Sequence, residues 1–304
     1  GGTGDNHSQV VFRSSSVRGP FVAYPGNPIL SQRDLDPNRP NPVTSAGHAK
    51  FVETQNGEWW ASFLATRPYG PDLYNIGRET FMLPVSWVNG WPIILEAGER
   101  IPFVVPMPNL PRQPPPRQPT SGNDLSYTDE FEGDGLSMAW IGIRTPRKPL
   151  YTLQGGALML HSSAALGDVK GVPAFIGRRQ QHHNVSVSTT LTYKPDKDGD
   201  RAGLVAIQND DAWWFFGVAR IEGKPVIALI ARQNSGEESL IASAPFNGES
   251  ATLTASANGG TAAFSYRLGG KTETLKSGFD VTFLSTRKAG GFVGTVIGPY
   301  AFDQ

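Results

Sequence analysis

Apolar and polar residues alternate along several short runs of the chain, and these runs come in pairs. Alternation puts successive side chains on opposite faces of a strand, so each run predicts a β-strand with one buried face. The turns inside the pairs contain Asn56-Gly57, Asn89-Gly90 and Glu222-Gly223, which suit the reversal of an antiparallel hairpin. The three predicted hairpins join residues 48–54 to 58–65, 80–87 to 91–95, and 213–221 to 225–231.

Helical periodicity is weak throughout the sequence. No long segment repeats apolar residues at the spacing of a helix face, whereas 35 Gly and 25 Pro residues punctuate the 304-residue chain. Frequent glycine and proline favour short strands joined by tight turns. The pattern therefore predicts an all-β fold.

Prolines crowd the stretch between Ile101 and Thr120. Each proline fixes φ and removes a backbone donor, so the stretch favours a stiff, extended path. We predict a linker over residues 101–122, which separates a first domain (1–100) from a second (123–304). After Asp129-Glu130-Phe131 the second domain has short runs separated by Gly, Asp and Asn turns, a spacing typical of a β-sandwich.

The first domain is too short to form a complete β-propeller from its hairpins. About 100 residues make roughly two four-stranded blades of ~40 residues each. Two blades cannot close a β-propeller, and an open edge would expose unpaired backbone groups and apolar side chains. The remaining blades of such a propeller are therefore expected to come from another polypeptide segment.

Charge and composition narrow the set of partners. The 27 basic and 27 acidic side chains balance, so the chain has no net field to attract nucleic acid or an anionic membrane, and we expect neither as a partner. The absence of cysteine excludes disulfides and thiolate chemistry but leaves the compartment open. No apolar stretch reaches the ~18 to 20 residues of a membrane span.

A set of motifs in the first domain is more specific than the strand pattern. It consists of Gly1-Gly2-Thr3-Gly4-Asp5-Asn6-His7-Ser8, Val10-Val11-Phe12-Arg13-Ser14, Gly19-Pro20-Phe21, Asn27-Pro28-Ile29-Leu30, Ser45-Ala46-Gly47-His48-Ala49, Gln55-Asn56-Gly57-Glu58-Trp59-Trp60 and Gly77-Arg78-Glu79-Thr80-Phe81. These motifs resemble the fourth and fifth blades of glycoside hydrolase family 43, in the branch that contains β-xylosidases and α-L-arabinofuranosidases. Asp5 departs from that branch, which often has an aromatic residue there.

The resemblance continues beyond the linker. The matching motifs of the second domain are Asp129-Glu130-Phe131, Phe175-Ile176-Gly177-Arg178-Arg179-Gln180, Ala202-Gly203-Leu204 and Gly290-Gly291-Phe292-Val293-Gly294. The resemblance implies the last two blades of a five-bladed β-propeller, followed by a jelly-roll or concanavalin-like sandwich. It also implies that the three catalytic carboxylates precede Gly1, so the N-terminal half of the enzyme is the expected companion chain.

The family's chemistry is hydrolysis with inversion and needs no redox cofactor. One carboxylic acid protonates the leaving oxygen while a carboxylate ~6.5 to 9.5 Å away activates water on the opposite face of the sugar. We assign neither role to a carboxylate of this chain. Spacing alone does not identify an acid and base pair among the candidates, and these are read as solvated loop charges and an ion pair: Asp34, Asp36, Asp72 and Glu79.

Arg78 is the first candidate for contact with the substrate. A guanidinium presents fixed donors to sugar hydroxyls, and its positive charge favours the ionised form of nearby carboxylates. The resemblance implies that Arg78 points into the sugar pocket. Without the resemblance, an adjacent arginine and glutamate on a strand are more often a structural pair.

Two histidines are candidates for the propeller axis. The resemblance places His7 beside the active site, and His48 is the second candidate. Related propellers often hold a calcium ion at the axis with mostly water around it, which makes His48 a candidate metal ligand. Imidazole can ligate a cation or donate to a carboxylate, and both alternatives stay open here, beside an ordinary structural role.

Phe292 matches a loop that in this branch brings an aromatic ring over the sugar site. An apolar wall there would shorten the pocket and favour removal of terminal sugars. The alternative is an ordinary strand residue in the sandwich core. Neighbouring aromatics on a strand face opposite sides, so we expect these to serve mainly in cores: Trp59, Trp60, Trp213, Trp214 and Phe215.

Two functions are therefore compared. The first is an exo-acting, secreted-type pentosidase that releases L-arabinofuranose or D-xylose from xylan or arabinoxylan, active only with the N-terminal propeller half. The second is a non-catalytic carbohydrate-binding or structural fragment. The choice between the two sugars stays open, because the discriminating walls include blades that precede Gly1.

Overall fold

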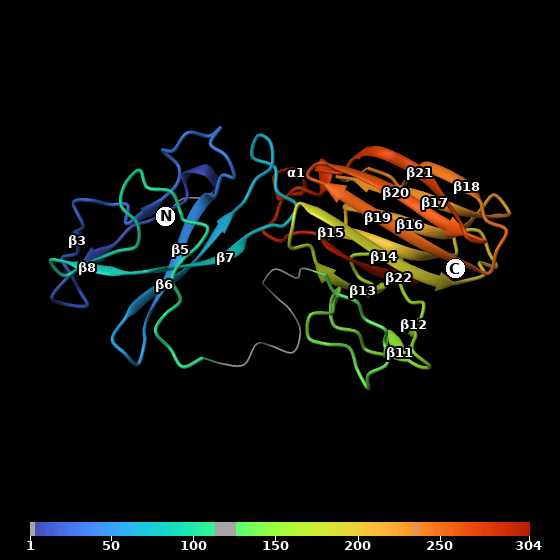
Figure 1. The fold of residues 1–304 in the computed structure, drawn as a ribbon, viewed down its shortest axis with the longest axis horizontal. Coiled ribbons are helices and arrows are strands. Elements are labelled where there is room, and N and C mark those ends of the chain that lie inside the picture. Colours follow the sequence, from blue (N-terminus) through green and yellow to red (C-terminus); the bar gives the residue numbers. More distant parts are fainter. Residues whose placement is uncertain (1–3, 113–125, 235) are drawn as a thin grey trace. The chain divides into compact units, whose positions relative to one another are not determined.

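The computed structural model describes residues 4–112, 126–234 and 236–304, and these residues form an all-β protein. The chain divides into two compact units. The N-terminal unit contains residues 1–71 and 78–126, and the sandwich unit contains residues 72–77 and 127–304. Figure 1 shows the strands of each unit, with colours that follow the sequence from blue at the N-terminus to red at the C-terminus. None of the described helices is long and apolar enough to cross a membrane.

The N-terminal unit is built from small antiparallel sheets. After a short 3-10 helix, η1 (Gly4–Asn6), the largest sheet has the order β5-β6-β7. The strands pair as β1 (Ser8–Gln9) with β4 (Leu30–Ser31), β2 (Phe12–Arg13) with β3 (Val22–Ala23), β5 (Thr44–Glu53) with β6 (Trp59–Thr66), β6 with β7 (Glu79–Pro84), and β8 (Ser86–Val88) with β9 (Trp91–Ile93). The described residues thus give one three-stranded sheet and three two-stranded sheets, rather than two complete four-stranded blades.

Of the two predicted hairpins in this unit, the one that joins residues 48–54 to 58–65 is confirmed, since β5 and β6 pair around Asn56-Gly57. The other is confirmed only near its turn: β8 and β9 pair around Asn89-Gly90, but residues 80–84, which we predicted as part of the same strand, lie in β7 and pair with β6. Asn89 and Gly90 have φ values of 51° and 72°, the left-handed backbone that a two-residue hairpin needs. A single core holds the sheets together, with Leu30, Phe63 and Leu83 among its buried side chains.

The sandwich unit consists mainly of two sheets. The seven-stranded sheet has the order β10 (Ile141–Gly142), β13 (Ala174–Arg179), β22 (Val296–Phe302), β15 (Arg201–Asn209), β16 (Ala212–Ile221), β17 (Lys224–Gln233) and β18 (Ser239–Pro245). The four-stranded sheet has the order β14 (Asn184–Thr192), β19 (Ser250–Asn258), β20 (Thr261–Leu268) and β21 (Lys271–Asp280). Between β21 and β22 the chain forms η2 (Thr282–Leu284) and α1 (Thr286–Ala289).

Burial patterns explain how the two sheets pack. In β14, Val185, Val187 and Leu191 pack against the core, while every second residue of the strand is exposed. By contrast, β15 and β16 are buried along nearly their whole length. One face of these strands packs on the four-stranded sheet, and the other carries a second core that includes Trp213, Phe215 and Tyr300. The seven-stranded sheet is therefore covered on both faces.

The aromatic residues that neighbour one another on strands were predicted to fill cores, and the burial of the sheet on both faces explains how they do so. Trp213 and Phe215 lie in one core, and Trp214, between them in sequence, lies in the other. Trp60 is also buried, whereas Trp59 is only partly buried and packs edge-on against Trp87. These rings serve mainly to fill the interior, as the alternation of strand side chains requires.

The second core is covered by the segment that precedes β13. Leu166 is 3% exposed within this core, and its backbone N–H donates to the Tyr300 hydroxyl at 3.2 Å. The segment also contains the short hairpin β11 (Tyr151–Leu153) and β12 (Leu158–Leu160). The sandwich unit therefore has three layers over part of its area.

The unit boundaries differ from the predicted domains in two places. The first part of the predicted linker packs on the N-terminal unit, because Ile101 is buried in its core and the Asn109 N–H donates to Glu58 Oε2 at 2.9 Å. Residues 113–122 of that linker lie outside the described residues. Residues 72–77, which we predicted to belong to the first domain, are part of the sandwich unit.

Candidate functional site

The start of β7 holds Glu79 in an ion pair with Arg67. Arg67 donates from Nε to Glu79 Oε2 at 2.8 Å and from Nη2 to Oε1 at 2.7 Å. The hydrogen bonds to Glu79 raise the pKa of Arg67, so the guanidinium stays charged. Such a two-point pair has a defined geometry and joins the end of β6 to the start of β7.

Arg78 therefore is not the partner of Glu79 in this pair. Arg78 directly precedes Glu79, and successive side chains of an extended chain point to opposite sides. Glu79 is partly buried by Arg67, while Arg78 is exposed. Glu79 thus pairs with Arg67, a contact that sequence adjacency did not reveal.

His7 is held against β5. Its Nδ1 lies 2.8 Å from the Ser45 carbonyl oxygen, and because a carbonyl only accepts, Nδ1 carries the hydrogen. A Cβ atom added to Gly47 would lie 2.8 Å from His7 Nε2, so the glycine makes room for the ring. His7 is partly buried by these contacts. The imidazole is thereby fixed in orientation and tautomer.

Strand β5 is irregular where His48 lies. Its pairing with β6 shifts register on both sides of Gly47, and Ser45 and His48 have φ values of 55° and 58°. These features describe β-bulges, which redirect side chains and often occur beside functional sites. The bulges leave the His48 side chain exposed.

His48 does not gather a set of metal ligands by itself. Calcium prefers six to eight oxygen ligands. Within residues 4–112, 126–234 and 236–304, no three His, Cys, Asp or Glu side chains are grouped so that they could hold a metal ion. A calcium ion held by one histidine and mostly by water needs no such group, so the calcium site at His48 stays a prediction, and no chemical step is assigned to a metal here.

Phe292 lies in a loop and not in the core of the sandwich. Its side chain is 62% exposed, so the alternative of an ordinary core residue is wrong. The loop is nevertheless anchored on both sides of Phe292. Gln208 Nε2 donates to the Gly290 and Val293 carbonyls at 2.9 and 3.2 Å, and Thr286 Oγ1 donates to the Val293 carbonyl at 2.8 Å.

All four loop and strand carboxylates have structural partners, although we predicted solvated loop charges and one ion pair. Asp34 pairs with Arg33 at 3.6 Å, Asp36 accepts from the Asn38 N–H at 2.9 Å, and Asp72 pairs with Arg287. Together with Glu79, they are three ion pairs and one turn contact. None of these contacts indicates an acid and base pair.

Residues 72–77 are the feature that sequence reasoning missed. They lie between β6 and β7 but pack on the loops after β21. The Tyr74 N–H donates to Ser285 Oγ at 3.0 Å, and the Thr295 N–H donates to the Asn75 carbonyl at 2.7 Å. Tyr74, Asn75 and Ile76 are each at most 7% exposed. We call residues 72–77 the strap. The only sequence signal for it was the glycine at each contact point, Gly77 and Gly294.

Two further polar groups in the sandwich unit are structural. Asp129 accepts from the Tyr127 hydroxyl at 2.8 Å and from Trp140 Nε1 at 2.7 Å, and Arg178 stacks 3.5 Å from the Tyr127 ring centroid. These contacts explain the Asp129-Glu130-Phe131 motif as an anchor for the segment that covers the second core.

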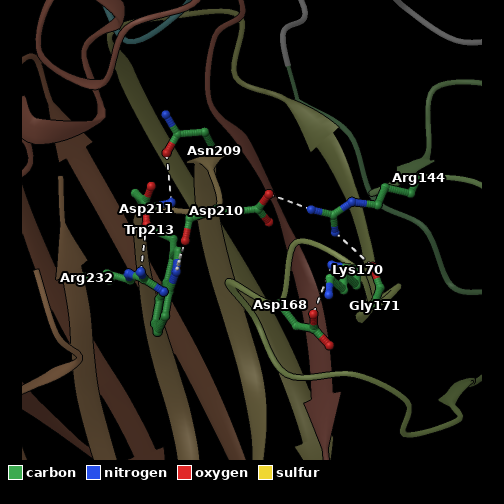
Figure 2. Close-up of polar contacts among 9 residues, drawn as sticks. All are labelled: Arg144, Asp168, Lys170, Gly171, Asn209, Asp210, Asp211, Trp213 and Arg232. Atoms are coloured by element: carbon green, nitrogen blue, oxygen red, sulfur yellow. Dashed lines mark hydrogen bonds and ion pairs between the residues drawn. The ribbon is translucent and has the colours of Figure 1, made fainter. Parts of the chain in front are cut away.

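Figure 2 shows the second group, which gathers at the turn between β15 and β16. Arg144 donates to the Gly171 carbonyl at 2.9 Å and to Asp210 at 2.5 Å, while Arg232 pairs with Asp211 at 2.7 Å. Each of the two neighbouring aspartates, Asp210 and Asp211, thus forms an ion pair with a different arginine. The group ties the covering segment to the seven-stranded sheet.

Comparison with known families covers both units. Residues 1–92 match the family described as "Glycosyl hydrolases family 43", and residues 128–304 match the "Beta xylosidase C-terminal Concanavalin A-like domain". The two matches together leave out residues 93–127, which include the proline-rich stretch.

Individual relatives align over almost the whole chain. A non-reducing end alpha-L-arabinofuranosidase of Bacteroides ovatus is 31% identical over 99% of the chain and 55% of its own length. A xylosidase/arabinosidase of Butyrivibrio fibrisolvens is 29% identical over 99% of the chain and 57% of its own length. The chain thus spans somewhat more than half the length of these relatives.

A solved structure supports the fold. The structure of xylan beta-1,4-xylosidase from Bacillus halodurans matches with a TM-score of 0.86 and 30% identity, over 100% of this chain and 58% of that protein. The second match to a concanavalin-like domain agrees with the two stacked sheets described above.

Proposed function

This chain belongs to glycoside hydrolase family 43, and we propose that it forms the C-terminal part of an inverting exo-glycosidase that releases L-arabinofuranose or D-xylose from xylan-derived chains. The relatives named arabinofuranosidase and β-xylosidase support this class of activity. The chain spans only part of these relatives, so the activity belongs to the assembled enzyme and not to these residues alone.

The match of residues 1–92 to the family 43 glycosyl hydrolases is the observation that carries the proposal. Arg67 occupies Glu79, and Arg78 is exposed at the neighbouring position. Arg78 then donates to hydroxyl or ring oxygens of the terminal sugar, and its charge keeps a nearby carboxylate ionised. The role is substrate contact and electrostatic support, and it involves no proton transfer by this arginine.

The protons are supplied by carboxylates outside these 304 residues. We propose that the N-terminal half of the propeller provides a general acid, which protonates the glycosidic oxygen, and a general base, which activates water on the opposite face of the sugar. Four carboxylates of this chain have structural partners here, which supports placing the general acid and base elsewhere: Asp34, Asp36, Asp72 and Glu79.

Phe292 and His7 complete the contribution of this chain. Phe292 forms an apolar wall over the sugar, which shortens the pocket and favours terminal residues over internal ones. His7, with Nδ1 donating to Ser45, presents a fixed ring edge at the axis of the propeller. His48 is a second axial residue, and a calcium ion held there mainly by water stays a prediction on which no step depends.

Hydrolysis assays test the function directly. The chain should be inactive alone and should hydrolyse nitrophenyl arabinofuranoside or nitrophenyl xyloside in the presence of the N-terminal half. Mass spectrometry under denaturing conditions should find that half as a copurifying polypeptide or as part of a longer chain. NMR of the first product should show the anomer opposite to that of the substrate. Polysaccharide binding without hydrolysis by the assembled protein would instead support a carbohydrate-binding module.

Secretion forms a separate part of the proposal. A polymeric xylan substrate is outside the cell, so we propose that the enzyme acts there. Fractionation of the source cells tests this part, because the activity should be recovered with the secreted or surface fraction. Recovery in the cytoplasm would limit the substrate to imported oligosaccharides.

A further inference from the structure

The sandwich unit has a groove of about 510 Å³ beside the β11–β12 hairpin, which is labelled in Figure 1. Its lining consists of Gly133 and Asp134, Pro149 and the three residues of β11. Sites for small ligands commonly have volumes of ~300–1,000 Å³. The groove is therefore large enough for a small ligand, and all of its lining belongs to one unit.

The open edge of β11 offers backbone hydrogen-bonding groups to this groove. At the hairpin turn, Gln154 and Ala157 exchange two backbone hydrogen bonds at 3.0 and 3.2 Å. Because hydrogen-bonded positions alternate in an antiparallel pair, the N–H and C=O groups of Tyr151 and Leu153 point away from β12. Among the described residues, these outward groups have no backbone partner. A ligand in the groove thus meets both donors and acceptors of the main chain.

Side chains of the lining add further polar groups. The side chains of Asp134, Tyr151 and Thr152 form no hydrogen bond or ion pair with other described residues. Tyr151 is partly buried, whereas Asp134 and Thr152 are exposed. A tyrosine ring packs well on the apolar face of a sugar, while hydroxyl and carboxylate oxygens bond to sugar hydroxyls. The combination suits a ligand with many hydroxyl groups.

The loop that contributes Asp134 is held in place. The Phe131 N–H donates to Asp129 Oδ1 at 3.0 Å, and the Phe131 ring centroid lies 6.0 Å from that of Trp140. Phe131 has a φ of 55°, an uncommon backbone conformation for a bulky residue, so its neighbours must stabilise it. The groove consequently has a defined wall on this side.

The charges next to the groove favour a neutral ligand. Glu132 and Asp134 carry negative charge on the loop, and Arg147 and Lys148 carry positive charge just before Pro149. With both signs present, no field of one sign attracts an ionic ligand. An added peptide strand is also less suitable, because β11 is only three residues long and strands usually pair over about five to six.

We propose that this groove binds a short, neutral stretch of xylan or arabinoxylan. Sugar hydroxyls both donate and accept, so they match the outward N–H and C=O groups of Tyr151 and Leu153, while Asp134 accepts from a further hydroxyl. The choice of polysaccharide rests on the proposed function, and the neutral, hydroxyl-rich chemistry rests on the groove itself. The sandwich unit then holds the polymer in addition to its structural role.

A matched pair of substitutions on the hairpin tests the groove. Tyr151→Ala removes the ring from the lining, whereas Met159→Ala shortens an exposed side chain on β12. Affinity electrophoresis of the assembled enzyme in gels with soluble neutral arabinoxylan measures binding. We expect the dissociation constant to rise about threefold to tenfold for Tyr151→Ala and to stay within about twofold for Met159→Ala. Equal retention of the two variants would overturn the inference.

A second pair covers the case in which Tyr151→Ala disturbs the fold, as a lower melting temperature would reveal. Asp134→Ala removes the carboxylate of the groove, and Asp196→Ala removes one from another exposed position of the sandwich unit. Asp134→Ala should weaken arabinoxylan binding about threefold or more, while Asp196→Ala leaves it unchanged. Unchanged binding by a folded Asp134→Ala variant would count against the groove independently of the tyrosine.

Hydrolysis of a nitrophenyl pentoside separates this inference from the proposed function. Tyr151→Ala should keep kcat/KM for that short substrate within about twofold of the unmodified enzyme, since the substrate contains no polymer chain. Arg78→Ala should show the opposite result, with kcat/KM lowered and arabinoxylan retention largely kept. Unchanged hydrolysis by Arg78→Ala would refute the proposed role of Arg78 and leave the groove standing; loss of polymer binding by neither groove variant would refute the groove and leave Arg78 standing.

Discussion

Arg67 and Glu79 illustrate how much depends on single contacts in this protein. Each side chain is about one-quarter to one-third exposed, and the two meet through two hydrogen bonds. Arg33 and Asp34 form a more exposed pair with one longer contact of 3.6 Å. Removal of one partner from the tighter pair leaves a partly buried charge, which costs more than the loss of an exposed pair.

We therefore predict that Arg67→Met lowers the free energy of unfolding by about 1–2 kcal/mol, after allowance for the partial exposure of the pair. The control Arg33→Met should lower it by less than about 0.5 kcal/mol. Urea denaturation followed by fluorescence measures both. Equal losses would mean that the geometry of the Arg67–Glu79 pair contributes nothing beyond its charge.

Phe292 should affect turnover more than stability. Because the ring is 62% exposed, Phe292→Ala should cost less than about 0.5 kcal/mol in unfolding free energy, while turnover of small pentosides by the assembled enzyme falls clearly. Phe264, which is fully buried, supplies the opposite control, since Phe264→Ala should cost about 3–5 kcal/mol. An unchanged turnover rate for Phe292→Ala would contradict the proposal that Phe292 forms an apolar wall over the sugar.

At the scale of elements, Asp200 connects two parts of the sandwich unit that are far apart in sequence. Its carboxylate accepts from the N–H groups of Asp196 and Lys197 at 2.9 and 2.7 Å, and from the Gln304 N–H at 2.8 Å. The residue thus joins the turn before β15 to the end of the chain after β22. Burial alone would raise the pKa of Asp200, but these backbone hydrogen bonds outweigh it and lower the pKa.

The lowered pKa predicts a loss of stability in acid. A carboxyl group with a lower pKa in the folded state stabilises the fold above its unfolded pKa, and this contribution disappears as the pH falls through the folded value. The free energy of unfolding should therefore decrease below about pH 4, and Asp200→Asn should flatten that decrease. Denaturation curves between neutral and acid pH measure it. Asp34→Asn, an equal change of charge at an exposed site, controls for net charge; identical slopes for both variants would contradict the assignment.

For the molecule as a whole, the double burial of the seven-stranded sheet has an energetic consequence. The covering segment is as much a part of the interior as the four-stranded sheet, because Leu166 lies in the second core with Trp213 and Tyr300. An acidic residue at position 166 would therefore place an unpaired ionisable group in an apolar site.

Leu166→Asp should consequently destabilise the chain by about 3 kcal/mol or more. Leu240→Asp makes the same chemical change on β18, where the side chain is 51% exposed, and should cost less than about 1 kcal/mol. Thermal unfolding compares the two. A small effect at Leu166 would mean that the covering segment detaches easily from the sheet.

Sequence reasoning reached the parts of this protein that depend on local rules. Alternation and left-handed turn residues located the hairpins around Asn56-Gly57, Asn89-Gly90 and Glu222-Gly223, because strand period and turn chemistry act over a few residues. The same rule identified Trp213, Trp214 and Phe215 as core residues. Motif resemblance indicated the family and singled out Arg78 and Phe292, whose proposed roles await the assays described above.

Tertiary structure alone decided which distant residues meet. Glu79 pairs with Arg67, because strand pairing brings the ends of β6 and β7 together. The strap joins the sandwich unit across more than two hundred positions of sequence, as in the contact of Tyr74 with Ser285. No periodicity encodes such contacts; only the glycines at positions 77 and 294 hinted at them, since a close approach of two backbones excludes every side chain.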